Sequence, residues 1–126
     1  MNNAINTQRE LENARRDAQS LAKRVQGNTE KSHAAIRAEA RTVAAEADQL
    51  GRAIQSLLEG QAADARQHLK DALTALKALY DENQRLAGAE DADVDAHNKA
   101  SFARAREAAH KVSEALAAKR ALAVHA

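Results

Sequence analysis

The sequence has no cysteine, no proline and no tryptophan, and only four glycines in 126 residues. Without cysteine the chain cannot form disulfides, thiolate nucleophiles or cysteine-based zinc sites, and this absence agrees with an intracellular setting. Without proline it lacks the strongest helix breaker. Among tyrosine, phenylalanine and tryptophan, the chain has only Tyr80 and Phe102. Most of the remaining apolar residues are alanine, and each alanine buries little apolar area. The sequence therefore predicts a thin core.

Neither positive nor negative charge is in excess. The chain has 19 Lys and Arg against 18 Asp and Glu, a formal net charge of +1. Proteins that bind nucleic acid generally carry a basic excess, often with aromatic side chains that stack on bases. Basic pairs such as Lys119 and Arg120 are more typical of a solvated helix face. We therefore expect neither nucleic acid nor a membrane surface as a partner.

Long apolar runs are missing as well. No segment approaches the roughly 20 apolar residues of a membrane span, and the first residues, MNNAINTQRELENARRD, lack the apolar centre of a signal peptide. The sequence therefore predicts a cytoplasmic protein.

The sequence is rich in alanine, leucine, glutamate, glutamine, arginine and lysine, the residues that enter helices at least cost. Apolar positions recur at alternate steps of three and four residues, as in packed helices. Gly27, Gly60 and Gly88 mark the breaks between helices. The predicted helices span residues 3–26, 30–59, 62–87 and 92–123 of a single domain that covers residues 1–126.

Short connections make consecutive helices antiparallel neighbours. The predicted fold is all-α, an antiparallel up-down four-helix bundle with alanine-rich, coiled-coil-like seams. By seam we mean the row of core-facing positions along a helix. A three-helix bundle with a detached first helix is the alternative.

Two details of the second predicted helix are informative. Asn28 or Thr29 is expected to cap its first turn, since both side chains can accept a hydrogen bond there. Gly51 lies in its interior, where glycine costs about 1 kcal/mol relative to alanine. The sequence therefore predicts that a neighbouring helix comes close to Gly51 or that the helix bends there.

The third predicted helix has the broadest apolar stripe. We assign Leu69, Leu73, Leu76 and Tyr80 to its seam and Ala72, Leu79 and Leu86 to its flank. The fourth helix is narrower, with a seam of Phe102, Ala105, Ala109, Val112 and Leu116. A stripe as wide as that of the third helix can face two or three neighbours. This helix is therefore either the most enclosed one or the one that offers a face to a partner.

Two Glu-x-x-His spacings, at Glu30 to His33 and Glu107 to His110, resemble the metal-binding motif of di-iron four-helix bundles. In an up-down bundle the second and fourth helices are parallel, but His33 lies in the first turn of its helix and His110 near the middle. At about 1.5 Å per residue the two histidines differ in level by about 15 to 20 Å. One metal centre cannot bridge that distance.

Asp64 with His68, and Asp93 with His97, place an acid and a histidine one helical turn apart. Each pair could supply half of a zinc site, although the same spacing is common on exposed helices. No serine, histidine and acid arrangement for nucleophilic catalysis is evident, and the glycines form no phosphate-binding loop. The sequence therefore predicts no catalytic residue, no metal ligand, no cofactor and no enzyme activity.

By elimination, the sequence predicts a non-catalytic helical interaction or assembly module. It would bind a partner protein, or itself as a homodimer, through an apolar helix face. Leu79, Tyr80, Leu86 and Phe102 are the predicted partner-binding residues, because large side chains dominate interface energies. The alternative function is a bundle that binds a small ligand or a metal ion between its helices, with His33 or His110 involved.

Overall fold

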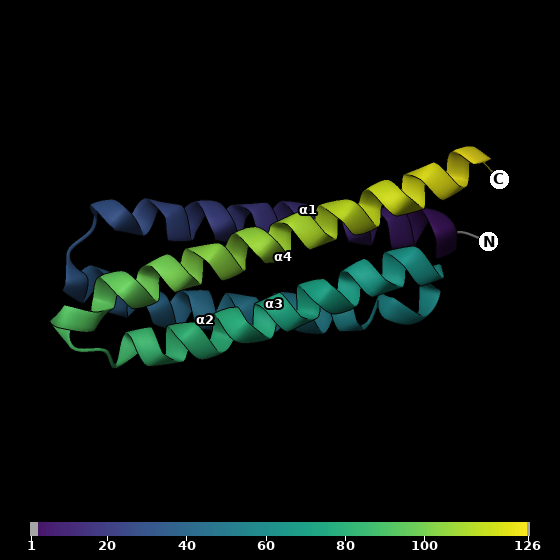
Figure 1. Cartoon of the computed structure of the whole chain (residues 1–126). Helices are drawn as coiled ribbons and strands as arrows, with labels where there is room; N and C mark the ends of the chain where they lie inside the picture. Colours follow the sequence, from purple (N-terminus) through teal and green to yellow (C-terminus); the bar gives the residue numbers. More distant parts are fainter. Residues whose placement is uncertain (1–2, 126) are drawn as a thin grey trace.

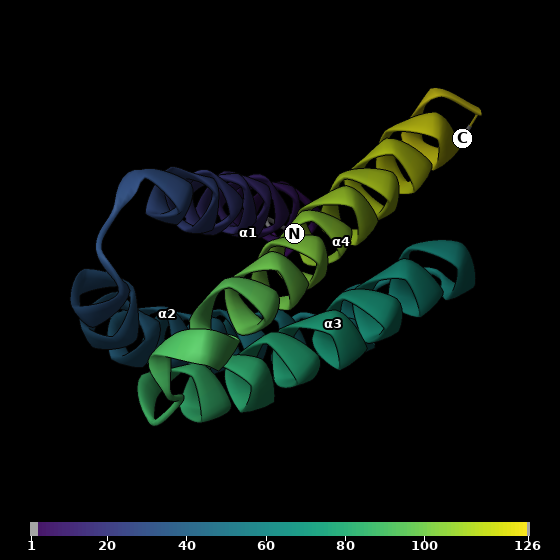
Figure 2. The same ribbon diagram turned by 60° about the vertical axis from the view of Figure 1, so that its left-hand side comes forward.

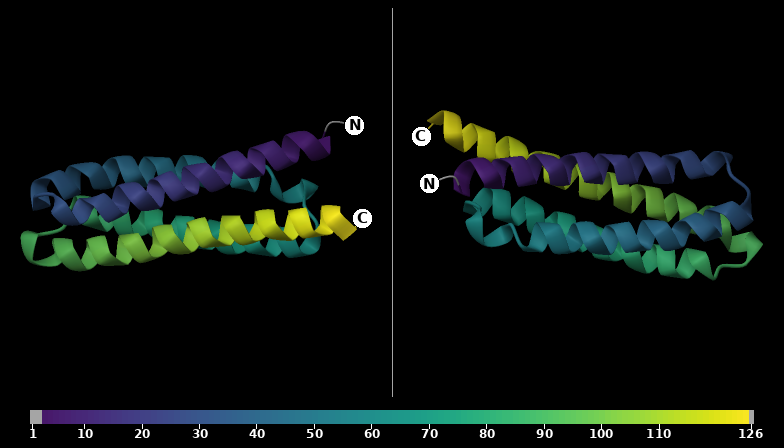
Figure 3. Two further views of the ribbon diagram at one scale, coloured as in Figure 1. Left: turned by 90° about the horizontal axis from the view of Figure 1, so that it is seen from above. Right: turned by 180° about the vertical axis from the view of Figure 1, so that it is seen from behind.

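The chain forms four long helices in a computed structural model that describes residues 3–125, with side chains described for residues 8–122. The elements are α1 (Asn3–Gln26), a 3-10 helix η1 (Gly27–Glu30), α2 (His33–Gln55), a 3-10 helix η2 (Leu58–Gly60), α3 (Ala63–Ala87) and α4 (Asp91–His125). The helices run alternately up and down (Figure 1). The two ends of the described chain lie at the same end of the bundle, where the last turns of α4 extend beyond α3 (Figure 3).

Each helix packs against two neighbours, in the order α1, α2, α3, α4 around the bundle. The contact between α3 and α4 is the most extensive of the four, and the contact between α1 and α2 is the least. In Figure 2, α4 lies between α1 and α3, and α2 lies across from it. The predicted all-α up-down four-helix bundle is confirmed. The alternative with a detached first helix is wrong, because α1 packs along α4.

The core is built from positions separated alternately by three and four residues. The buried seam residues are Leu11, Ala14, Ala18, Leu21 and Val25 of α1; Ile36, Ala40, Val43, Ala47, Leu50 and Ile54 of α2; Leu69, Ala72, Leu76, Leu79, Asn83 and Leu86 of α3; and Val94, Asn98, Ser101, Ala105, Ala108, Val112 and Ala115 of α4. This repeat is the one that allows side chains of one helix to pack between those of its neighbours. The many alanines allow the helices to approach closely.

Three of the predicted helices agree with the structure to within two residues, but α2 is shorter than predicted. Its cap is Ser32, whose Oγ accepts a hydrogen bond of 3.2 Å from the backbone N of Ala35. The prediction that Asn28 or Thr29 caps α2 is wrong: both lie in η1 instead. At its other end α2 stops at Gln55, and η2 follows, so the predicted break near Gly60 is confirmed.

The seams of α3 and α4 are rotated from the predicted ones. Leu73 and Tyr80 were expected on the seam of α3 but are only partly buried, at its flank, while Leu79 is at the centre. In α4, Ser101 is fully buried where Phe102 was expected. The physical reason is that polar residues occupy seam positions, so an assignment based on apolar residues alone shifts to the next apolar side chain.

A layer of buried polar groups divides the core. The Nδ2 of Asn83 in α3 donates hydrogen bonds to the Oγ of Ser101 in α4, at 2.9 Å, and to the backbone oxygen of Leu79, at 2.8 Å. Asn28 and Asn98 are also buried. Beyond this layer lies a small apolar cluster of Ile36, Ala40, Leu86 and Val94, separate from the main core. The larger cluster holds most of the other buried leucines.

Candidate interaction surfaces

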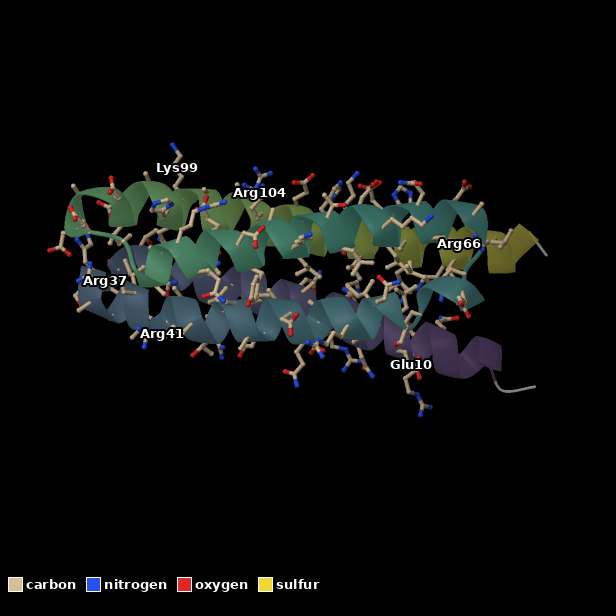
Figure 4. The ribbon with its side chains drawn as sticks, turned by 90° about the horizontal axis from the view of Figure 1, so that it is seen from below. Glu10, Arg37, Arg41, Arg66, Lys99 and Arg104 are labelled. Carbon is tan, nitrogen blue, oxygen red and sulfur yellow. The ribbon has the colours of Figure 1, made fainter. Side chains whose placement is uncertain are left out.

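A groove of about 420 Å³ runs between α2 and α3. Figure 4 views the bundle from this side, with Arg37 and Arg41 toward one end of α2 and Arg66 at the start of α3. The apolar residues of the groove are Ala47 and Leu76, which are buried, and Leu73 and Tyr80, which are partly exposed. The exposed charged residues along it are Asp48 and Arg52 from α2 and Lys77 and Asp81 from α3. An apolar strip with charged edges is typical of a protein-binding surface.

Gly51 lines this groove in the middle of α2. A Cβ atom added there would lie 3.9 Å from Cδ2 of Leu73, an ordinary van der Waals distance. No described glycine has a positive φ, so the backbone also does not require glycine at this position. The sequence predicts that a neighbouring helix comes close to Gly51 or that the helix bends there; α3 does lie in contact range through Leu73, but not so close that it excludes a side chain. The packing of the chain itself gives no reason for glycine.

A second groove, of about 730 Å³, lies between α1 and α4 on the opposite side of the bundle. Phe102 is its one aromatic residue and is partly buried. The guanidinium carbon of Arg106 lies 5.6 Å from the centre of the Phe102 ring, a cation–π arrangement. Arg106 therefore already covers part of this aromatic surface.

The structure separates the four predicted partner-binding residues into two groups. Leu79 and Leu86 are 0% exposed and belong to the interior. They can touch a partner only if the bundle opens. Tyr80 and Phe102 are partly exposed, but they line different grooves on opposite sides of the molecule. Their role in binding a partner stays a prediction, and no single face presents all four residues.

Every histidine with a described side chain lies beside a carboxylate. The closest pairs are His33 Nε2 with Asp95 at 3.3 Å, His97 Nδ1 with Glu82 at 2.8 Å, His68 Nδ1 with Glu114 at 3.3 Å, and His110 Nε2 with Glu114 at 2.7 Å. Most of these pairs join two helices. Within residues 8–122, no three His, Cys, Asp or Glu side chains are placed so that they could hold one metal ion.

His33 and His110 are far apart, as the sequence predicts. His33 contacts Asp91 and Asp95 in the first turns of α4. His110 lies 15 residues after Asp95, or about 22 Å along the same helix at 1.5 Å per residue. The two Glu-x-x-His spacings therefore belong to different levels of the bundle.

Arginines from a neighbouring helix lower the pKa of two carboxylates. Arg120 in α4 donates a hydrogen bond of 3.1 Å to Glu12 in α1 and, with a smaller effect from Gln8, lowers the pKa of the Glu12 carboxyl. Arg37 in α2 donates a hydrogen bond of 2.6 Å to Asp91 at the start of α4 and lowers the pKa of that carboxyl. These exposed pairs connect α4 to both α1 and α2.

None of the described helices is both long enough and apolar enough to cross a membrane. Neither a protein-family model, nor a curated protein, nor a solved structure matches the chain.

Proposed function

We propose that the chain is a non-catalytic helical interaction or assembly module of the cytoplasm, which binds a protein through the groove between α2 and α3. The bound protein is either a different partner or a second copy of the chain. The observation that carries this proposal is the partly exposed pair Leu73 and Tyr80 in a groove with charged edges. Tyrosine supplies a large contact area at low cost in side-chain entropy, and it is enriched in interface centres.

Two further grooves along the bundle are less suitable for a protein contact. The groove between α1 and α2 is lined mainly by polar and charged residues, among them Asp17, Arg24 and Glu46. In the groove between α1 and α4, Arg106 already lies over the ring of Phe102. We therefore favour the groove between α2 and α3, where Leu73 and Tyr80 are both partly exposed.

Site-specific photo-crosslinking in cells tests this proposal. A benzophenone amino acid replaces Tyr80, and the adducts are resolved by mass after irradiation. We expect a discrete adduct, because the side chain at this position would lie against the bound protein. The mass of the adduct distinguishes a second copy from a different partner.

The matched control carries the same amino acid in place of Arg104, an exposed residue of α4 outside the grooves. This control should give no discrete adduct. Adducts of equal yield from both positions, or none from Tyr80, would contradict a binding surface between α2 and α3.

A further inference from the structure

We propose that the groove between α2 and α3 receives a second copy of the same chain, with the two α2 helices antiparallel about a twofold axis close to Gly51. This inference rests on the proposed function and names its partner. Three observations support it: a glycine that the chain does not need, a charge pattern that is complementary to itself, and partly exposed apolar side chains beside both.

Gly51 is the first observation. Glycine in a helix interior costs about 1 kcal/mol relative to alanine, and the interior of this chain leaves room for a Cβ at that position. Glycine is used where another backbone must approach closely. Since no helix of the same chain does so at Gly51, the approaching backbone comes from outside the chain.

The charges on either side of Gly51 are the second observation. Arg52 donates a hydrogen bond of 3.1 Å from Nε to Oδ2 of Asp48, and the two side chains are 81% and 50% exposed. The two residues are placed symmetrically about position 50. In an antiparallel pair of α2 helices centred there, Asp48 of each copy faces Arg52 of the other. The ion pair that each chain makes within its own α2 can then form between the two copies instead, and these two positions place no like charges opposite each other.

The next residues along the same stripe are compatible with this arrangement. Ala45 and Gln55 are both exposed and are also symmetric about position 50, so each Ala45 would face Gln55 of the second copy. Neither residue is charged. A contact that uses the same surface on both copies needs this kind of self-complementarity.

The partly exposed apolar residues are the third observation. Leu73 lies 3.9 Å from the position of a Cβ at Gly51, and Tyr80 lines the same groove. Close approach of a second α2 would remove part of both side chains from water. This burial supplies a driving force that the exposed ion pairs alone do not provide.

Substitution of Gly51 gives the sharpest test, because monomer stability and association should change in opposite directions. We expect Gly51→Ala to raise the thermal midpoint at low protein concentration, where the chain is a monomer, because alanine favours helix and fits the space. The same change should weaken dimerisation at least tenfold in sedimentation equilibrium, and Gly51→Leu should abolish it. Ala103→Leu, at an exposed position in the groove between α1 and α4, is the matched control and should leave dimerisation unchanged.

A charge exchange tests the predicted pairing. Arg52→Asp places acidic residues opposite each other and should dissociate the dimer. The double variant Asp48→Arg with Arg52→Asp inverts both partners and should restore association. Arg104 and Glu107 of α4 form a comparable exposed pair, 3.8 Å apart, so Arg104→Glu is the control and should have no effect.

Tyr80 provides a direct readout, because the chain has one tyrosine and no tryptophan. The fluorescence emission of Tyr80 should change with protein concentration in parallel with the molar mass measured by sedimentation equilibrium. A wild-type chain that stays monomeric up to its solubility limit overturns the inference, and so does a dimer that tolerates both Gly51→Leu and Arg52→Asp. If such a monomer still gives a Tyr80 adduct with a different protein, the proposed function stands and only the identity of the partner is wrong.

Discussion

The contact between α3 and α4 and the contact between α1 and α2 differ in what holds them together. α3 and α4 meet through fully buried residues such as Leu69, Leu79 and Val112. Between α1 and α2, Arg24 lies 3.3 Å from Glu39 and also binds Glu46. These side chains lie beside a groove of about 380 Å³ that both polar and apolar residues line. The contact between α3 and α4 therefore depends on apolar burial, whereas the smaller contact between α1 and α2 adds exposed ion pairs to its apolar residues.

This difference predicts an uneven distribution of stability. Burial of a leucine side chain contributes about 1.5 to 3 kcal/mol, whereas an exposed ion pair contributes about 0 to 1 kcal/mol. α1 is also secured by α4, its other neighbour. The side of α1 that faces α2 is therefore the part of the bundle that opens most easily.

The largest expected effect comes from replacing one buried leucine with alanine in each of the two contacts. Leu79→Ala should lower the free energy of unfolding by about 2 to 5 kcal/mol, because the side chain is enclosed by α3 and its neighbours and leaves a cavity. Leu21→Ala should cost about half as much, since Leu21 lines the open groove between α1 and α2. Urea denaturation measures both values. Equal costs would mean that the two contacts are equally well packed.

Removal of the ion pairs should have a smaller effect. Arg24→Met keeps most of the aliphatic length of the side chain but loses the contacts with Glu39 and Glu46. We expect a loss below about 1 kcal/mol at low ionic strength and almost none in 1 M salt, because exposed charges are screened. Hydrogen exchange should show faster opening of α1 than of α3. A loss that is independent of salt would indicate packing rather than charge.

The smallest expected effect is a change of the free energy of unfolding with pH in the acid range. The pKa values of Glu12 and Asp91 are lowered in the folded chain, so their contribution is present above the unfolded values, about 4.5 and 3.8. This contribution should disappear as the pH falls through the folded values. The substitution of Asp91 by Asn should remove part of the pH dependence below about pH 4 in urea titrations. An unchanged profile in this variant would show that the pair of Asp91 with Arg37 does not contribute.

The sequence was sufficient for the fold but not for the orientation of each helix. The alternation of three and four residues predicts helices and their number, because this signal repeats in every turn. The orientation of α3 depends on Asn83, and that of α4 on Asn98 and Ser101, which are buried although they are polar. A pattern of apolar residues therefore assigned Leu73 and Tyr80 to the core.

The candidate groove follows from this same rotation. With Leu79 rather than Tyr80 at the centre of α3, Tyr80 turns toward α2 and is left partly exposed. Tyr80 and Phe102 were among the predicted partner-binding residues for their size alone, but size does not reveal that they lie on opposite sides. The space beside Gly51 also could not be predicted, because it depends on how far α3 lies from α2.

The hydrogen bond between Asn83 and Ser101 also fixes the alignment of α3 along α4. Seams that are rich in alanine are nearly uniform along their length, so a slide of one helix past the other by a turn, about 5.4 Å, would still bury apolar surface. Such a slide would remove the bond from Asn83 to Ser101 and leave the Asn83 amide only its bond to the Leu79 oxygen of its own helix, at a cost of about 0.5 to 1.5 kcal/mol. A single polar pair therefore selects one alignment among several that apolar packing alone would tolerate.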